Sequence, residues 1–291
     1  MYLAGCAIGE SPMPMMTIGG AYRKEVNKLT EREYRSHPAI SRSELWKIRE
    51  SPEKFKFYKE NPPEPTPALV FGQLFHAMAL NQGTEDFAVA PNIDRRTKEG
   101  KAAYAEWLNA SEGKTVVTAD MWDKAVEMCA AFQGNEFCRK LLSGKKEVPF
   151  FWTDEDTQEA CKCRTDVLTE IEGISLVVDL KTTSDASTDG FIRDAVKFGY
   201  DFQAAMYLEG VKANTGVEHG FVFIAIEKEP PYSVNILQAD TLFIKHGYDL
   251  FREYIGIYHD CKTTNNWYGY LGRFDAINAL SLPPWLKKEV E

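Results

Sequence analysis

The stretch that decides the fold is VVDLKTT, residues 177–183. Its apolar beginning is typical of a buried strand, and an acidic and a basic residue, Asp179 and Lys181, follow near its end. Alternate residues of a strand project from the same face of the sheet, so this spacing places the carboxylate beside the ammonium group. Such a pair is either a surface salt bridge or part of a catalytic site.

The segments around this strand predict a sheet. Three apolar or alternating segments are separated by turn-forming residues, as in an antiparallel meander: 147–153, 159–168 and 174–182. Helical periodicity follows at about 186–212. Strands at about 220–227 and 232–238 and a long helix at about 240–262 complete the pattern. We therefore predict an α/β fold, with a central mixed sheet that begins with an antiparallel meander and is flanked by helices.

The sequence before this sheet is predominantly helical. Residues 28–60 predict two helices that are separated at His37-Pro38, with Ser41 or Ser43 capping the second helix. The apolar segment ALVFGQLFHAMALNQG predicts a buried helix. A charged helix is predicted at 94–110 and an amphipathic helix at 118–143.

Length and composition indicate how these elements are organised. The 291 residues are 44% hydrophobic, enough to bury a substantial core. We predict a flexible tail at 1–20 and a single domain at 21–291. This domain would consist of a helical part, 21–145, and a catalytic core, 146–265.

Charge and cysteine content narrow the class of protein. A net charge of −9 argues against a broadly basic surface for nucleic acid, although a local basic groove beside an acidic metal site remains compatible with it. The six cysteines form no disulfide framework, so we expect reduced thiols in a cytoplasmic protein. No apolar run approaches the roughly 18 residues of a membrane span, so we expect no membrane partner.

A second carboxylate lies on the strand before VVDLKTT. The segment CKCRTDVL carries Asp166, and neighbouring antiparallel strands can bring Asp166 and Asp179 close enough to hold one divalent cation. A metal there, with Lys181 alongside, would suit hydrolysis of a phosphodiester. Each feature also has a simpler interpretation, because a strand-end Asp-x-Lys is usually a surface ion pair and a histidine on an apolar helix is usually a core residue.

The order of these motifs resembles the PD-(D/E)XK nuclease core. Asp166 and Asp179-Leu180-Lys181 are followed by DFQAAMYLEG, in which Gln203 and Tyr207 lie four residues apart and so share one helix face. The resemblance is narrower to the RecE-type exonucleases, the exodeoxyribonuclease VIII group, and it covers about 30–265. Further matching segments are HPAISRSEL, SPEKF, FGQLFHA and DRRTKEGKA.

The resemblance implies roles for individual residues. The catalytic residues would be Asp166, Asp179, Lys181, Gln203 and Tyr207. The metal ligands would be His76, Asp166, Asp179 and the Leu180 carbonyl. Residues that would contact DNA are Arg95, Arg96, Lys98, Lys101, Arg164, Thr182 and Thr183.

The resemblance also implies an activity and its partners. We expect a Mg²⁺-dependent exodeoxyribonuclease, with Mn²⁺ as the alternative ion. It would degrade the 5′-ended strand of double-stranded DNA from its ends and leave a 3′ single-stranded tail for recombination. Relatives in this family form homo-oligomeric rings, so a tetramer is expected, and a single-strand annealing protein would take up the product strand.

One departure from the family pattern and two alternative functions accompany this expectation. No iron-sulfur cluster is expected, because Ser51 stands before Pro52 where related cluster-bearing nucleases carry a cysteine. A Cas4-like or restriction-type nuclease of the same superfamily is the alternative enzyme. A non-catalytic protein that binds DNA ends is the alternative from another class.

Overall fold

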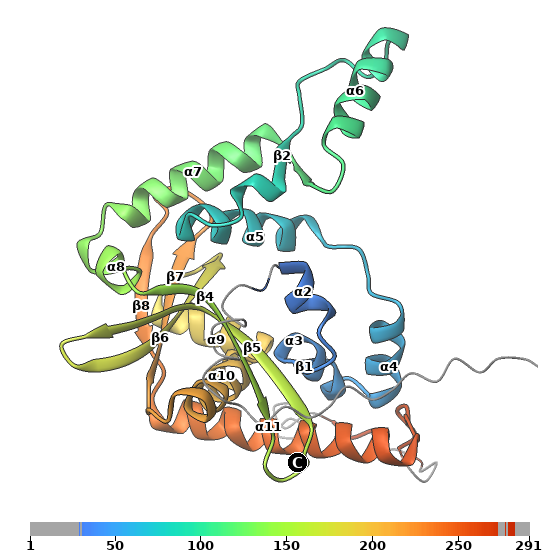
Figure 1. Ribbon diagram of the computed structural model, residues 1–291, viewed down its shortest axis with the longest axis vertical. Coiled ribbons are helices and arrows are strands. Elements are labelled where there is room, and N and C mark those ends of the chain that lie inside the picture. Colours follow the sequence, from blue (N-terminus) through green and yellow to red (C-terminus); the bar gives the residue numbers. More distant parts are fainter. Residues whose placement is uncertain (1–28, 30, 273–276, 278, 283–291) are drawn as a thin grey trace, which may run out of the picture. The chain divides into compact units, whose positions relative to one another are not determined.

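The computed structural model describes residues 29, 31–272, 277 and 279–282. The chain divides into two compact units, Met1–His37 and Pro38–Glu291. Helix α2 (Glu31–Ser36) belongs to the first unit, and all the elements discussed below belong to the second (Figure 1). The predicted flexible tail at 1–20 lies outside the described residues, and the predicted single domain at 21–291 stays a prediction.

A mixed sheet forms the centre of the second unit. Within the described residues it has six strands in the order β1-β5-β6-β7-β8, with β4 also paired to β5. The strands are β1 (Ile40–Ser41), β4 (Lys145–Thr153), β5 (Ala160–Ile171), β6 (Ile174–Thr183), β7 (Gly220–Glu227) and β8 (Val234–Gln238). Strands β4, β5 and β6 pair antiparallel in sequence order, whereas β7 pairs parallel to β6. The predicted meander and mixed sheet are confirmed; the two-residue β1, parallel to β5, was not predicted.

Helices cover both faces of this sheet, and each face has its own apolar core (Figure 1). Neighbouring residues of β6 alternate between the cores, since Val177 belongs to one and Val178 to the other. The first core packs against α3 (Arg42–Leu45), η1 (Trp46–Arg49), α4 (Pro52–Glu60), α9 (Thr188–Phe198), α10 (Tyr200–Thr215) and α11 (Thr241–Thr264). The second packs against α5 (Pro67–Leu80), α7 (Ala119–Gln133) and α8 (Glu136–Leu141).

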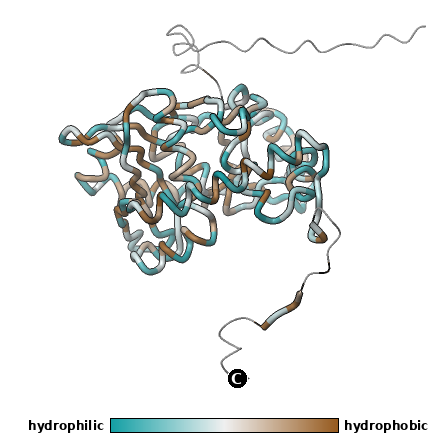
Figure 2. Tube along the Cα trace, turned by 90° about the horizontal axis from the view of Figure 1, so that it is seen from below, coloured by the Kyte–Doolittle hydropathy of each residue, from teal (hydrophilic) through white to brown (hydrophobic). Residues whose placement is uncertain are grey.

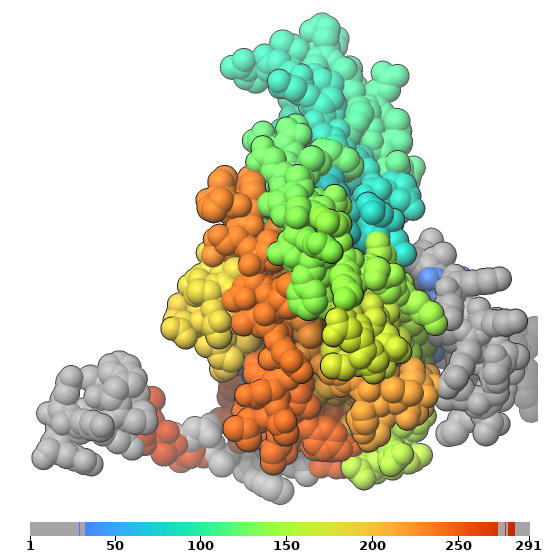
Figure 3. Space-filling model, turned by 90° about the vertical axis from the view of Figure 1, so that its left-hand side faces the viewer, coloured from blue at the N-terminus to red at the C-terminus, as the bar shows by residue number. Residues whose placement is uncertain are grey.

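A smaller substructure carries the most exposed helix. After η2 (Thr84–Asp86), the short strands β2 (Phe87–Val89) and β3 (Thr115–Val117) pair in parallel. Between them, α6 (Lys98–Ala110) stands away from the packed core in both Figure 1 and Figure 3. All of α6 is described, and Gly100 is its one buried residue.

Three predicted helices are each interrupted in the structure. The helix predicted after His37-Pro38 stops before Ser51, whose hydroxyl accepts the Lys54 amide at 3.2 Å and caps α4. Asn135 similarly caps α8 and ends the predicted 118–143 helix early. The predicted 186–212 helix is split by Gly199, which has φ +67° and stands so close to Trp46 that a Cβ would lie 2.5 Å from the indole ring.

Hydropathy follows this packing. Hydrophobic segments are concentrated inside the packed part of the chain, and many outer turns are hydrophilic (Figure 2). Within the described ranges, each helix is too short or too polar to cross a membrane.

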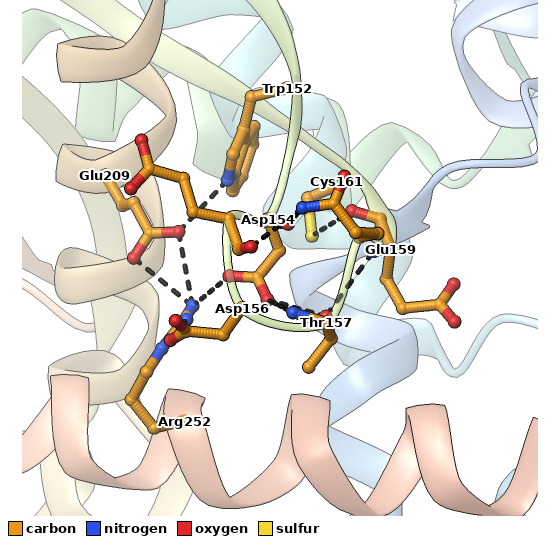
Figure 4. A network of polar contacts seen from close by, with 10 residues as sticks. Trp152, Asp154, Asp156, Thr157, Glu159, Cys161, Glu209 and Arg252 are labelled. Atoms are coloured by element: carbon orange, nitrogen blue, oxygen red, sulfur yellow. Dashed lines mark hydrogen bonds and ion pairs between the residues drawn. The ribbon is translucent and has the colours of Figure 1, made fainter.

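A polar network fastens the β4–β5 turn to the helices behind it (Figure 4). Arg252 of α11 contacts Asp154 Oδ2 at 2.6 Å and Asp156 Oδ2 at 3.0 Å. It also lies 3.3 Å from Glu209 of α10, which accepts a hydrogen bond from the Trp152 indole at 3.1 Å. Asp154 is 1% exposed and Arg252 is 23% exposed, so these charges are mostly removed from water. Arg252 therefore compensates carboxylates that burial would otherwise destabilise.

We predict that Arg252→Met lowers the free energy of unfolding by about 3 kcal/mol, because it leaves buried Asp154 without its cation. The matched control on the same helix is Lys245→Met, whose exposed pair with Asp249 should contribute at most about 1 kcal/mol. Urea unfolding of both variants measures the difference. Equal destabilisation would contradict the importance assigned to the network.

Candidate active site

The site forms where β5 and β6 separate. Their antiparallel ladder ends at the pair Val167–Val178, one residue before Asp166 and Asp179 would face each other. Beyond that point the Asp166 carboxylate accepts the Leu180 amide at 2.7 Å. A side-chain oxygen thus replaces the backbone acceptor that a continued ladder would supply. Asp166 is thereby held beside the backbone of VVDLKTT.

Helix α5 contributes His76 to the same place. The buried side chains of Leu74 and Phe75 fix this helix against the sheet. His76 Nε2 lies 2.8 Å from the Leu180 carbonyl oxygen, and Nδ1 lies 3.4 Å from Asp166 Oδ2. Three of the four predicted metal ligands, His76, Asp166 and the Leu180 carbonyl, therefore converge.

The geometry of His76 favours a metal cation between its ring and Asp166. A carbonyl oxygen only accepts hydrogen bonds, so Nε2 must carry the proton that it donates to Leu180. In a neutral ring, Nδ1 would then direct its lone pair towards the Asp166 carboxylate. A metal ion between these two atoms would remove the repulsion. Imidazole nitrogen, carboxylate and carbonyl oxygen are all suitable ligands for a divalent cation.

Asp179 is held on both sides by other predicted site residues. Lys181 Nζ forms an ion pair with Asp179 Oδ2, and Gln203 of α10 donates to Oδ1 at 2.5 Å. Asp179 is 2% exposed and Lys181 is 16% exposed. Burial raises the pKa of Asp179, and the negative charge of Asp166 adds to this effect, whereas Lys181 opposes it. A buried carboxylate in such surroundings is typical of a functional site rather than of a surface salt bridge.

The fit of a metal to these residues is incomplete in one respect. Within the described residues, no group of three or more His, Cys, Asp or Glu side chains is close enough together to hold a metal ion. Asp179 is the predicted ligand that does not join the other three, because its carboxylate oxygens contact Lys181 and Gln203 instead. His76, Asp166 and the Leu180 carbonyl still lie together, with Nδ1 of the ring facing Asp166 Oδ2 and Nε2 facing the carbonyl oxygen, so a turn of the ring would let His76 share a cation with either oxygen.

Tyr207, the second residue of the predicted Gln203/Tyr207 pair, lies one helical turn after Gln203 on α10. It is part of the α10 face that packs against the first core, and its ring lies 6.4 Å from that of Phe221. Tyr207 also interacts electrostatically with Arg42. The structure therefore places Gln203 against the acidic residue and Tyr207 one turn away.

Two neighbours of the site were not predicted. The ring of Tyr200 lies 4.9 Å from Lys181 Nζ, and burial, with a contribution from Asp179, raises the pKa of its hydroxyl. Arg42 donates to the Gly199 carbonyl at 2.7 Å and to the carbonyl of Phe198. Burial lowers the pKa of Arg42, and the negative charge of Asp179 acts against that shift. Arg42 lies within HPAISRSEL, a segment that matches the RecE-type family. This match was the one sequence feature that could have indicated a role for Arg42.

The residues predicted to contact DNA do not form one surface. Arg95 lies over the ring of Tyr104, with its guanidinium carbon 4.6 Å from the ring centre, and Arg96 pairs with Asp94 at 2.9 Å. These residues, with exposed Lys98 and Lys101, belong to α6 and the turn before it, away from β6 (Figure 1).

The other predicted DNA contacts lie on the sheet. Arg164 pairs with Glu147 at 2.7 Å. Thr182 is half-buried beside Lys181. Thr183 is buried and donates to Asp194 of α9 at 2.8 Å, which gives its hydroxyl a structural contact.

Comparison with known proteins identifies the class to which this fold and site belong. The chain is a PDDEXK-like protein: residues 41–279 match the family described as "PDDEXK-like domain of unknown function (DUF3799)". The protein belongs to this family, which is consistent with its mixed sheet flanked by helices. No curated protein matches the sequence.

Solved structures support the fold. A crystal structure of a "putative exonuclease" from Eubacterium rectale is similar at 18% sequence identity and a TM-score of 0.60. The match covers 90% of this chain and 98% of that one. A structure of the protein SSO0001 matches at 12% identity over 64% of this chain and 85% of that one, but its TM-score of 0.30 carries no argument.

We predict that His76→Ala weakens Mn²⁺ binding at least about tenfold, because loss of a direct ligand should cost no less than loss of an outer hydrogen-bond partner. Isothermal titration calorimetry on the purified protein measures the dissociation constant. His219→Ala is the control, since His219 is half-buried and its Nδ1 faces the Val217 carbonyl. The same constant for wild type and His76→Ala would leave His76 as a packing residue.

Proposed function

We propose that this protein is a metal-dependent DNA nuclease. The observation that carries the proposal is the arrangement of Asp179. Its carboxylate contacts both Lys181 and Gln203. The next residue of the strand is Leu180. Its carbonyl oxygen contacts His76, and its amide donates a hydrogen bond to Asp166. Membership in a PDDEXK-like family supports a phosphodiester as the bond that is cut.

Each residue has a role in this proposal. His76, Asp166, Asp179 and the Leu180 carbonyl would hold Mg²⁺ or Mn²⁺. The bound ion would lower the pKa of a water molecule and neutralise charge on the phosphate. Lys181 would place its ammonium group against the charge that develops on the phosphate oxygens during attack. Gln203 would keep the Asp179 carboxylate oriented, as its 2.5 Å hydrogen bond does here.

The finer proposal is a RecE-type exonuclease that degrades the 5′-ended strand of a duplex and leaves a 3′ tail. Support comes from the order of the sequence motifs and from the fold shared with the Eubacterium rectale protein described as a "putative exonuclease". The tetrameric ring and the annealing partner stay predictions from the family resemblance. A Cas4-like or restriction-type nuclease is distinguished by its substrate.

The experiment compares linear and covalently closed duplexes, labelled at either the 5′ or the 3′ end of the linear form, with and without Mg²⁺. We expect Mg²⁺-dependent degradation of linear DNA that releases the 5′ label first. Asp179→Asn should reduce the rate by at least about a hundredfold, because it removes a charge at the reacting centre. The control is Asp249→Asn on the exposed face of α11.

Several outcomes would contradict parts of the proposal. Cutting of closed circles would indicate a restriction-type enzyme, and early release of the 3′ label would reverse the polarity. DNA binding without hydrolysis in any divalent cation would support the non-catalytic alternative. Equal rates for Asp179→Asn and Asp249→Asn would remove Asp179 from the chemistry.

Helix α6 is proposed as a contact for the DNA backbone. Lys98 and Lys101 are exposed in its first turn, and Arg95 lies beside them over Tyr104. A helix with one buried residue gains little from packing against its own chain, which leaves its cations available to phosphates. The segment is therefore a local basic surface on a protein of net charge −9.

The double variant Lys98→Gln/Lys101→Gln should flatten the salt dependence of duplex binding. Each lost phosphate contact removes about 0.9 from the slope of log K against log salt concentration, so the expected change is about 1.8. The control is Lys212→Gln/Lys245→Gln, which removes the same charge from exposed positions on α10 and α11. An identical slope for both variants would make α6 an ordinary exposed helix.

A further inference from the structure

An exposed aromatic side chain stands at the rim of the candidate active site. Phe198 is the last residue of α9 and is 43% exposed. Its ring centre lies 6.0 Å from that of Tyr200, with 32° between the ring planes. The Tyr200 ring in turn lies 4.9 Å from Lys181 Nζ, so the Phe198 ring centre is within about 11 Å of the proposed catalytic ammonium group.

The backbone that carries Phe198 is held rigidly. Arg42 donates to the carbonyls of Phe198 and Gly199. Gly199 has the left-handed φ of +67° and is in close contact with Trp46, where any larger residue would collide with the indole. Tyr200, on the far side of this turn, packs against Phe191 at 5.6 Å and Phe223 at 5.8 Å. The exposed ring is thus presented at a fixed position and is not on a loose loop.

The surroundings of Phe198 suit a nucleic-acid base better than an apolar protein surface. Lys197 places its Nζ 5.1 Å from the Phe198 ring centre, and Lys181 Nζ lies 4.9 Å from the centre of the neighbouring Tyr200 ring. Arg193 adds a further exposed cation, which pairs with Asp185 at 3.4 Å. Every nucleotide joins a flat aromatic base to an anionic phosphate, and an aromatic ring with a cation beside it complements both groups.

We propose that Phe198 is a stacking platform for an unpaired base next to the scissile phosphate. This inference rests on the proposed function, and it adds a substrate-positioning residue that the sequence motifs did not include. The terminal base pair of a duplex would open so that one base lies on Phe198. Its phosphate would then lie towards Lys181 and Asp179. Substrate ends that are already frayed or single-stranded would be bound more readily than fully paired ends.

The first test is a cycle of two changes, one in the protein and one in the DNA. Phe198→Leu removes the ring but keeps an apolar side chain, and a second substrate lacks the base next to the scissile phosphate. With the normal substrate, Phe198→Leu should raise KM about 5- to 150-fold, which corresponds to about 1–3 kcal/mol. With the abasic substrate, wild type and Phe198→Leu should have the same KM.

Two further variants separate stacking from a general effect on structure. Phe198→Trp keeps an aromatic face and should restore a KM near that of wild type. Phe137→Leu is the control, because Phe137 of α8 is similarly exposed at 49% and belongs to the opposite face of the sheet. An unchanged KM for Phe198→Leu, or an equal rise on the normal and abasic substrates, would overturn the platform.

A binding measurement keeps this inference independent of hydrolysis. The fluorescence of the indole introduced by Phe198→Trp should be quenched by a single-stranded oligonucleotide in Ca²⁺, even if no DNA is ever cut. Quenching in Ca²⁺ combined with no hydrolysis in either Mg²⁺ or Mn²⁺ would reject the proposed nuclease activity and keep the platform, whereas hydrolysis in Mg²⁺ without quenching in Ca²⁺ would do the reverse. If Phe198→Leu instead lowers the mass measured by light scattering and leaves KM unchanged, the patch joins copies of the chain and the platform is wrong.

Discussion

The hydrogen bond from the Leu180 amide to Asp166 is the interaction on which the candidate site depends. It forms just beyond Val167–Val178, the last pair of the ladder between β5 and β6. A continued ladder would use these backbone groups within the sheet and leave no opening between the strands. Because the Asp166 carboxylate satisfies the amide, β6 can diverge from β5 while its backbone remains paired with β7 on the other side. The Leu180 carbonyl and the Asp179 side chain are then available at the point of divergence.

The helical part that precedes the sheet completes this opening from both of its faces. Helix α5 supplies His76 across a sequence separation of 104 residues, and the β1–α3 segment supplies Arg42 to the α9–α10 turn. Arg42 does not contact the Asp166–Leu180 pair; it holds the backbone of the turn that positions Tyr200 and, further along α10, Gln203. The site therefore requires long-range packing within the Pro38–Glu291 unit. The helices before the sheet and the sheet with its later helices each supply only some of the site residues.

Part of this arrangement followed from local sequence rules. The two-residue period of a strand places Asp179 and Lys181 on one face, and the structure pairs them. Short turns between apolar segments predicted the meander, which brings Asp166 opposite VVDLKTT. The helical period placed Gln203 and Tyr207 on one face, but only tertiary packing determines that Gln203 meets Asp179 while Tyr207 packs towards Phe221.

Other features of the fold and site could not be predicted from local sequence, or had sequence patterns that neighbouring residues concealed. A two-residue strand such as β1 has no periodicity to detect, and the role of Arg42 depends on a turn more than 150 residues away. The breaks at Ser51-Pro52 and Gly199 follow familiar rules for caps and left-handed residues, yet helical periodicity on both sides concealed them. His76 was assigned through family resemblance, since an apolar helix by itself does not indicate which of its residues meets a strand.

The central claim is that His76, Asp166 and the Leu180 carbonyl form one side of a metal site, which Asp179 completes. Anomalous diffraction from crystals soaked in Mn²⁺ tests it most directly, because the signal locates the ion without reference to activity. The account predicts a peak within bonding distance of Asp166 and the Leu180 carbonyl, with His76 and Asp179 turned towards it. A peak bound only by other residues, or none beside Leu180 at a Mn²⁺ concentration that supports hydrolysis, would contradict the account.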